Sequence, residues 1–463
     1  MLYVNNVQRF LPGMQHFPAK KKKLSGWGGV PAVECVTYRP EKRQMLAAFA
    51  AGHEAPVIAR GCGRAYGDAA LSVTGVVEME RLDRFIAFDE KTGVLRVEAG
   101  VTLADMLNVV IPAGWFLPVI PGTKFVSAGG AFASNVHGKN HARQGDFARH
   151  VVECVVRLAS GEAITCSKTE HSDVFWATAG GMGLTGIIEE MTLQLLPVTS
   201  LSLRVHTKKT PSIHAMVTAF RQSDAEYKIG WIDHFVRGDA FGRGVFEMAS
   251  HISEHEGGMP LASYRPPTRG ITIPPFFPGI VLNRYSMALY NVRRFRRYGD
   301  SLPEEVVGFE GFFHPLDRLQ HWNRLYGRRG FFQYQCVIPD SPDVADHLNA
   351  LLQLIRRRGC FSYLAVLKYM GDHEGLLSFP LRGFSLALDF PNTPAVCALQ
   401  HELNEQVANL GGRVYLTKDA LLSRGHFERM YRDALPEWKR IVRECDPARH
   451  FMSEMAIRLG MKE

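Results

Sequence analysis

The sequence lacks several features that would assign it to a familiar class. Its eight cysteines form no C-x-x-C pair, so neither a zinc site nor a thioredoxin-like redox motif has support. Scattered cysteines in a chain of 463 residues are typical of reduced core residues in a cytosolic protein. No stretch of 18 apolar residues occurs, and no apolar segment follows the basic run at 20–23. We therefore expect neither a transmembrane helix nor a secretory signal.

The composition indicates an ordinary globular protein. We find no internal repeat and no low-complexity segment, and the 46% hydrophobic and 22% charged residues allow a large core. The length favours two domains. A net charge of +8 favours an anionic partner, which could be nucleic acid, a phosphorylated substrate or an anionic membrane. No helix-turn-helix, RRM or zinc signature is present, so no nucleic-acid partner is expected.

Hydrophobic periodicity predicts an α+β organisation. Alternation over 84–89 and 93–98 predicts a β-hairpin, and Thr102 is a candidate N-cap for a helix over 103–111. Further strands are expected over 151–158, 161–165 and 187–196. After Pro197 the composition changes to that of a second α+β domain, with a strand over 330–339 and a helix over 343–358.

Two later segments stand out. Residues 264–298 carry several early Pro and Gly residues, then apolar residues and the run Arg293-Arg-Phe-Arg-Arg-Tyr298, which predicts a mobile surface loop. The C-terminal part predicts a short strand over 410–415 and a helix over 423–445, which Asp446-Pro447 ends.

Three glycine-rich segments are the candidate ligand-binding loops. The first, 59–68, follows the apolar pair Val57-Ile58, and its glycines let backbone N–H groups converge on an anion beside Arg60 and Arg64. Taken alone, it could equally be a plain turn between strands.

The second glycine-rich segment, 121–131, contains Gly129-Gly130 and runs into His137, Lys139 and His141. These three side chains would share one face of an extended segment. The alternative is a basic turn with hydrogen-bonded histidines.

The third segment, 180–186, contains a literal G-x-G-x-x-G at Gly181, Gly183 and Gly186. A helical stretch precedes it and a strand-like run follows it, which is the reverse of the order that a Rossmann fingerprint requires. One extended pyrophosphate ligand, contacted from several loops, explains the three segments together.

These segments resemble the FAD-binding domain of the vanillyl-alcohol-oxidase/p-cresol-methylhydroxylase superfamily, and in particular the decaprenylphosphoryl-β-D-ribose 2′-oxidase family. The resemblance runs from about residue 20 to the end of the chain. The motifs that carry it lie at 60–68, 121–123, 137–141, 175–188, 314–317, 333–335, 378–380 and 411–419. His137-Gly-Lys-Asn-His141 and Tyr415-Leu-Thr-Lys-Asp419 are specific to this family, whereas the glycine clusters belong to the whole superfamily.

The resemblance implies a two-domain α+β fold of the vanillyl-alcohol-oxidase type. Residues 1–199 and 412–463 would form the FAD-binding domain, and residues 200–411 a substrate domain built on an antiparallel sheet. The implied flavin-binding residues are Arg60, Gly61, Gly63, Arg64, Ala65, Tyr66, Gly67, Pro121, Gly122, Thr123, Gly129, Gly130, Asn135, His137, Gly138, Gly181, Gly183, Thr185, Gly186, Ile187 and Tyr415.

The FAD is expected to be non-covalent. Superfamily members that attach the flavin use a His in a Gly-Gly-His turn, whereas this chain reads Gly63-Arg-Ala-Tyr66 there, and Cys62 is the only nearby thiol. No metal is expected.

The resemblance also implies the chemical roles. Lys418 and His137 are the catalytic candidates beside the isoalloxazine, and a desolvated Lys418 would also polarise the alcohol. The alternative for Lys418 is an ordinary ion pair with Asp419 or a surface position. The expected substrate-binding residues are Lys139, Gln333, Gln335, Lys368 and Lys418.

The implied reaction is oxidation of the 2′-hydroxyl of a polyprenyl-phosphoryl-β-D-ribose to the 2′-keto sugar. A short-chain NADH-dependent keto-reductase would complete the epimerisation to the arabinose lipid, for arabinan and cell-wall synthesis. We expect a cytoplasmic protein on the inner membrane face, with 264–298 resting on an anionic lipid surface. The alternatives are a soluble sugar-lactone or alditol oxidase and a reductase similar to UDP-N-acetylenolpyruvoylglucosamine reductase.

Two positions depart from the family pattern. Ala387 stands where mycobacterial members carry Cys, which puts susceptibility to thiol-directed inhibitors in doubt but not hydride transfer. Phe313 stands where the family has a Tyr before His-Pro-Leu-Asp, which puts one polar contact in doubt.

Overall fold

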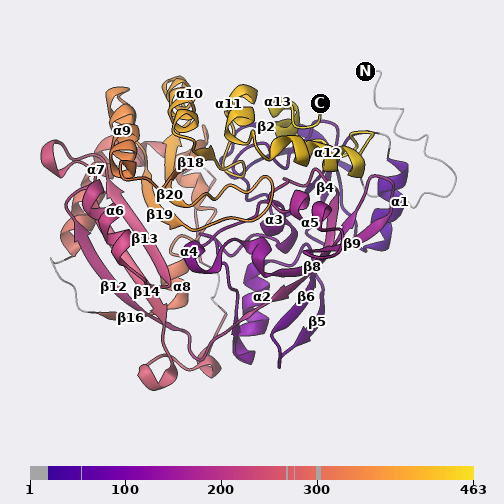
Figure 1. Ribbon diagram of the computed structural model, residues 1–463, viewed down its shortest axis with the longest axis horizontal. Coiled ribbons are helices and arrows are strands. Elements are labelled where there is room, and N and C mark those ends of the chain that lie inside the picture. Colours follow the sequence, from indigo (N-terminus) through magenta and orange to yellow (C-terminus); the bar gives the residue numbers. More distant parts are fainter. Residues whose placement is uncertain (1–18, 54, 267–269, 276, 299–303) are drawn as a thin grey trace.

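The computed structural model describes residues 19–53, 55–266, 270–275, 277–298 and 304–463. Two α+β parts lie side by side, with the C-terminal helices over the first of them (Figure 1). The first part contains two sheets of four and five strands, and the second contains one sheet of eight strands. This arrangement confirms the α+β class predicted from the sequence.

The N-terminal part is built from short strands, as the sequence predicts. Its first sheet has the order β1-β2-β4-β3, with β1 (Ala19–Ser25), β2 (Ala32–Tyr38), β4 (Val76–Glu78) and β3 (Ile58–Arg60). Its second sheet has the order β5-β6-β10-β8-β9, with β5 (Phe85–Asp89), β6 (Val94–Glu98), β10 (Ile187–Gln194), β8 (Val151–Arg157) and β9 (Ala163–Ser167). The β7 (Trp115–Phe116) and β11 (Leu196–Pro197) strands form a small separate pair.

Several local predictions for this part are confirmed. The hairpin is β5 paired with β6, and the Thr102 side chain caps α2 (Leu103–Val110) by accepting a hydrogen bond from the Asp105 backbone N–H. Helix α5 (Ser172–Thr178) precedes the third glycine segment and β10 follows it, so this segment is not a Rossmann turn. The remaining helices are α1 (Gln44–Gly52), α3 (Ala128–Ala133) and α4 (His141–Gln144).

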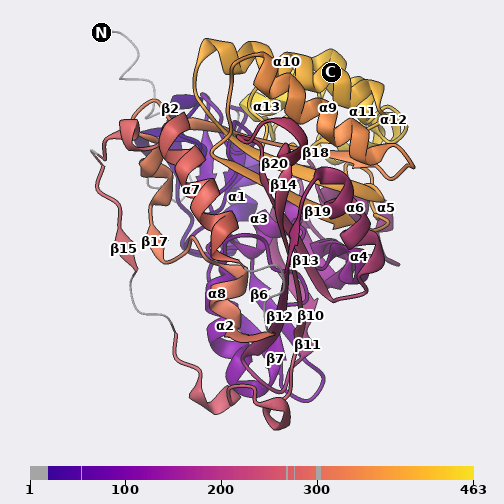
Figure 2. The ribbon, with the colours of Figure 1, turned by 90° about the vertical axis from the view of Figure 1, so that its left-hand side faces the viewer.

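The large antiparallel sheet has the order β16-β12-β14-β13-β19-β20-β18-β21. Its strands are β16 (Glu305–Gly308), β12 (Ser202–Thr210), β14 (Arg243–His251), β13 (Tyr227–Asp233), β19 (Leu364–Met370), β20 (Gly383–Pro391), β18 (Phe331–Pro339) and β21 (Arg413–Val414). Helices α6 (Ile213–Gln222), α9 (Val344–Arg357) and α10 (Pro394–Asn409) cover one face, and α7 (Arg284–Arg297) and α8 (Phe309–Phe313) lie on the opposite side (Figure 2).

The prediction of a mobile loop over 264–298 was wrong in its second half, where α7 forms. The Pro and Gly residues end at Gly279, and Asn283 then caps the helix by accepting from the backbone N–H groups of Tyr285 and Ser286. The first half contains short 3-10 turns and β15 (Ile271–Thr272), which pairs with β17 (Leu319–Gln320). Residues 267–269 and 276 lie outside the described residues.

The C-terminal segment links the two parts. Strand β21 pairs with β18, and α11 (Arg424–Met430), α12 (Leu435–Cys445) and α13 (Glu454–Leu459) follow. The single helix predicted over 423–445 is in fact two, because Pro436 occupies the first turn of α12 and cannot continue a preceding helix. Trp438 Nε1 on α12 donates to the Ala177 carbonyl, which fixes these helices on the N-terminal part. None of the described helices is long and apolar enough to cross a bilayer.

Candidate functional site

A cavity of about 1030 Å³ lies between the glycine-rich loops and the face of the eight-stranded sheet that also carries α7. This volume is at the upper end of the roughly 300–1,000 Å³ that small-molecule sites occupy. The predicted site residues that line it are Gly61, Gly63, Arg64, Ala65, Tyr66, Pro121, Gly122, Thr123, Gly129, Gly130, His137, Lys139, Gly183, Gly186, Gln333, Gln335, Lys368, Tyr415 and Lys418. Folding thus brings together three loops and two strands that are far apart in the sequence.

Seven other predicted residues do not belong to the cavity wall; they are Arg60, Gly67, Asn135, Gly138, Gly181, Thr185 and Ile187. Two of them, Arg60 and Thr185, make contacts behind the cavity wall. The Arg60 guanidinium donates to the carbonyls of Ser25 and Ala70, and Thr185 Oγ1 lies 2.9 Å from Thr178 Oγ1 in the core.

The first two glycine-rich loops approach each other closely, with the Gly61 backbone against the Ser127 side chain. A Cβ on Gly61 would lie 2.0 Å from Ser127 Oγ, which accepts a hydrogen bond from the Gly130 N–H at the start of α3. Only glycine therefore allows this close approach, and it leaves backbone groups facing the cavity. Beside them, the Arg64 guanidinium stacks 3.9 Å above the Trp27 ring, and its Nε is buried without a partner among the described residues.

The opposite wall consists of side chains on one face of the large sheet. Gln333, Asp389 and Leu364 are cross-strand neighbours on β18, β20 and β19, and Gln335 lies opposite Ala387. The Ala387 side chain therefore places a methyl group in the cavity wall.

Asp389 is a site residue that the sequence analysis missed. Its side chain is buried and accepts hydrogen bonds from Gln333 Nε2 at 2.6 Å and from Tyr326 Oη at 2.8 Å. Burial raises the pKa of this carboxyl group, whereas both hydrogen bonds and the charge of Lys418 oppose the shift. The available signal was an Asp in the largely apolar strand 384–390, on the same face as Ser385 and Ala387.

His137 is buried and neutral, and its proton can be assigned to one nitrogen. Gln335 Nε2 donates to His137 Nε2 at 2.9 Å and to Ser385 Oγ at 3.0 Å, so the imidazole proton lies on Nδ1. Burial, and then the charge of Lys368, hold the pKa of His137 well below its usual range. Nδ1 is buried without a partner among the described residues, and it is a donor available to a ligand.

Lys418 lies in the turn that follows β21, where its backbone N–H donates to the Tyr415 carbonyl at 2.9 Å. Its Nζ is 4.0 Å from the centre of the Tyr66 ring. Partial burial lowers the pKa of Lys418 to about 7, and the negative charge of Asp389 limits the shift. Lys418 is therefore close to half-charged at neutral pH.

The alternative ion pair between Lys418 and its neighbour Asp419 does not form. Asp419 instead binds Arg458 at 2.9 Å, and Arg458 also binds Asp68 at 2.7 Å. This cluster fixes the first glycine-rich loop to the turn that carries Lys418.

Two further lysines line the same cavity. Lys139 Nζ donates to the Phe312 carbonyl and lies 3.9 Å from the centre of the Phe312 ring. Burial lowers the pKa of Lys139 to about 7 and that of Lys368 to about 8. The remaining wall beside them includes Trp231 of β13, Glu247 of β14 and Arg294 of α7, none of which was predicted from the sequence. Arg294 was missed because α7 was taken for a loop.

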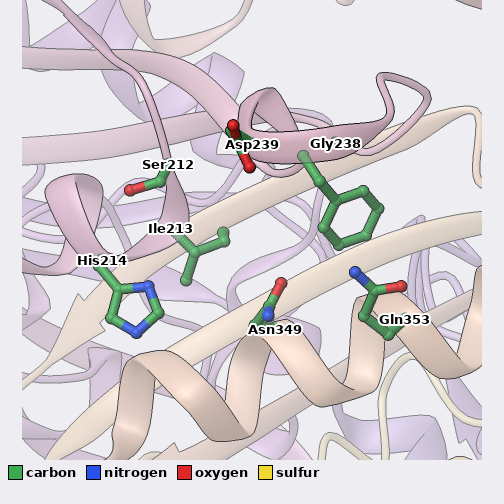
Figure 3. Close-up of a pocket in the computed structure, with 8 residues that line it drawn as sticks. Ser212, Ile213, His214, Gly238, Asp239, Asn349 and Gln353 are labelled. Carbon is green, nitrogen blue, oxygen red and sulfur yellow. The ribbon is translucent and has the colours of Figure 1, made fainter.

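A second cavity of about 190 Å³ lies between the start of α6, the turn at 238–240 and α9 (Figure 3). Its two ionisable side chains, His214 and Asp239, are exposed. It contains none of the residues predicted to carry chemistry, so the large cavity is the candidate active site.

The chain is similar to several known proteins. Residues 38–167 match a family described as an FAD binding domain. The chain is 33% identical to decaprenylphosphoryl-beta-D-ribose oxidase of Mycolicibacterium smegmatis, over 96% of the chain and 99% of that protein. It is 32% identical to an uncharacterized protein from the mprA 5′ region of Streptomyces coelicolor, over 78% of the chain and all of that protein. It is 21% identical to L-gulonolactone oxidase of Bos taurus, over 85% of the chain and 87% of that protein.

Proposed function

Because this chain belongs to the decaprenylphosphoryl-β-D-ribose oxidase family, we propose that it oxidises the 2′-hydroxyl of a polyprenyl-phosphoryl-β-D-ribose to the 2′-keto sugar. The chain is an FAD-dependent oxidoreductase that acts on a hydroxyl group. What supports the lipid-linked ribose as substrate is the extent of the similarity, which covers 99% of the mycobacterial protein and so includes its substrate-binding part. In this proposal, residues 1–199 and 412–463 hold FAD and residues 200–411 hold the substrate.

The cavity fits FAD. Backbone-lined loops at 61–66 and 121–130 suit a pyrophosphate. Arg64 and His137 line the cavity, and Arg64 Nε and His137 Nδ1 are buried donors without a partner among the described residues. We propose that Arg64 binds the pyrophosphate side, and that His137 and Tyr415 bind the isoalloxazine side. FAD held by these residues would supply a two-electron acceptor for the hydride of the alcohol carbon.

We propose that the FAD is held without a covalent bond. The turn at 63–66 contains no His, and burial raises the pKa of the nearby Cys62 thiol to about 11. A protonated thiol is a poor nucleophile, so Cys62 is not suited to form a link to the flavin.

In the proposed mechanism, Lys418 takes the proton of the sugar hydroxyl. With a pKa of about 7 its Nζ has a free lone pair in a large fraction of molecules at neutral pH, as a general base requires. The Asp389 carboxylate then stabilises the ammonium group that forms. His137 stays neutral and donates from Nδ1, and Gln335 holds its ring in that tautomer.

The test is anaerobic bleaching of the purified protein with polyprenyl-phosphoryl ribose, followed at about 450 nm, where oxidised flavins absorb. We expect rapid bleaching by the lipid-linked ribose and none by L-gulonolactone or a free alditol. Bleaching only by a lactone or alditol would overturn the substrate and favour the soluble-oxidase alternative within the same fold.

The proposed reaction defines two partners. The 2′-keto product requires a reductase of the short-chain NADH-dependent class, which would add hydride from the opposite face to give the arabinose lipid for arabinan and cell-wall synthesis. We also propose that the enzyme works peripherally on the cytoplasmic face of the inner membrane, where such a lipid would be found, with α7 on the anionic surface.

Helix α7 is suited to that surface. Tyr285 is 81% exposed and Leu289 is 55% exposed, and the surrounding segment 264–298 contains seven Arg and no Asp or Glu. We expect the double variant Tyr285→Ser/Leu289→Ser to bind phosphatidylglycerol vesicles about a hundredfold more weakly in a flotation assay, because two apolar side chains at the lower end of roughly 1.5–3 kcal/mol each contribute about 3 kcal/mol together. Ile457→Ser on α13, at a side chain that is 58% exposed, is the matched control and should bind as the wild type does. Equal binding by all three proteins would contradict the assignment.

A further inference from the structure

Charge is unevenly distributed in the large cavity. Its acidic side chains are Asp389, Glu247, Glu310 and Glu305. Asp389 is the negative charge beside Lys418, Glu247 pairs with Arg294 at 3.6 Å, Glu310 pairs with Lys124, and Glu305 is exposed at the start of β16. Lys139 and Lys368 also line the cavity, and neither has an ion-pair partner among the described residues. Two lysine side chains without an ion pair in a largely enclosed space favour an anionic ligand, because a bound anion stabilises their charged form.

The two lysines approach the cavity from different elements. Lys368 is on β19, where it pairs with Ser385 on β20, one step along the sheet from Gln335 and its neighbour Ala387. Lys139 follows His137 in the second loop and uses only one of its three N–H donors on the Phe312 carbonyl. Burial, and then the positive charge of Lys368, lower the pKa of Lys139 to about 7, while Glu247 opposes the shift. A bound anion would therefore favour the charged form of this lysine.

We propose that Lys139 and Lys368 together form an anion subsite for the phosphodiester of the lipid-linked substrate, next to the carbon that is oxidised. The assignment rests on the proposed function, because in a ribose joined to phosphate through C1 the reacting C2 is the adjacent carbon. A subsite that binds the phosphate on C1 would therefore also place C2, the carbon that is oxidised, near Lys418.

The lining beyond the two lysines suits a polyprenyl chain. Phe312, Phe313 and Trp231 are buried aromatic residues of the wall, and Tyr290 of α7 lines the cavity while being 51% exposed. The cavity therefore runs from the glycine loops past the lysines to the helix proposed to lie on the membrane. A lipid tail would leave along this apolar path.

The test uses the holoenzyme and farnesyl methyl phosphate, a phosphodiester with one fixed negative charge and no sugar. Binding is measured by calorimetry and by the perturbation of the flavin spectrum. We expect Lys368→Met and Lys139→Met each to weaken binding about tenfold or more, because each removes one charge-assisted hydrogen bond. The neutral farnesyl methyl ether should bind weakly and equally to all variants, and Lys91→Met, at an exposed turn residue away from the cavity, should match the wild type.

The pH dependence gives a readout that a purely structural role would not produce. The groups facing the two lysines are His137, Lys418, Glu247 and Arg294, of which His137 is neutral throughout. Diester affinity should fall as the pH rises above about 7, where Lys139 loses its proton, and more steeply above about 8, where Lys368 loses its proton. The second part of this fall should disappear in Lys368→Met. Ether binding should not change with pH.

Unchanged diester affinity in both lysine variants, or equal affinity for diester and ether, would overturn the subsite. Inorganic phosphate that competes at the same concentration as the diester would show a free-phosphate site instead of a lipid one. The proposed function fails separately: the wild type would then bind the diester but would not be bleached by polyprenyl-phosphoryl ribose. Bleaching with an unchanged KM in Lys368→Met would instead refute only the subsite.

Discussion

Replacing Lys418 with Met should lower kcat for sugar oxidation by about a thousandfold, within the 10²–10⁴ range of general-base catalysis, while FAD stays bound. Lys418 Nζ lies 4.0 Å from the centre of the Tyr66 ring in the cavity wall. FAD should remain bound because Lys418 lies outside the glycine-rich loops proposed to hold the cofactor. Flavin content is read from the absorbance of the purified variant, and kcat from steady-state turnover of the lipid-linked ribose.

The pH profile tests the direction of proton transfer. A base is active when deprotonated, so the kcat/KM of the wild type should fall about tenfold for each pH unit below about 7, the pKa of Lys418. Lys418→Arg is the decisive control, because a guanidinium keeps the positive charge but does not lose its proton. If Lys418→Arg were as active as the wild type, the residue would act by charge alone and the proposed role as a base would be wrong.

The local features of the fold could be predicted because they depend on neighbouring residues. The turn and alternation at 84–98 specify a hairpin, and Thr102 caps α2 by a hydrogen bond three residues along the chain. Helix α7 was missed because the Pro and Gly residues that precede it led to the prediction of a loop over the whole segment 264–298. Asn283 is nevertheless an ordinary N-cap, and α7 itself contains no Pro or Gly.

The site was only partly predictable for a different reason. Glycine loops and family motifs mark residues such as Gly61 and Lys418, but the partners of a buried group come from distant strands. Nothing in the sequence near Lys418 indicates that Asp419 turns to Arg458 while Asp389 supplies the negative charge. These partners are set by the pairing of β20 with β18 and by the position of α13, which are tertiary features.

Asp389→Asn should lower kcat by about 10- to 100-fold and should move the acidic limb of the kcat/KM profile to lower pH. Asp389 raises the pKa of Lys418 against the effect of burial, so removing its charge makes Lys418 a weaker base that holds the transferred proton less well. The amide keeps the shape of the side chain, and its oxygen can still accept from Gln333 while its NH2 group donates to the Tyr326 hydroxyl oxygen, so the change is mainly one of charge.

Tyr326→Phe separates the charge of Asp389 from its packing. This variant removes the 2.8 Å hydrogen bond to Asp389 and leaves the carboxylate in place. We expect its acidic limb to remain near that of the wild type, even if kcat falls, whereas Asp389→Asn shifts the limb. If the acidic limbs of the two kcat/KM profiles lay at the same pH, or if Asp389→Asn shifted its limb to higher pH, Asp389 would support the cavity wall without affecting the pKa of Lys418. A shift to lower pH confined to Asp389→Asn would identify Asp389 as the group that keeps the pKa of Lys418 near neutrality.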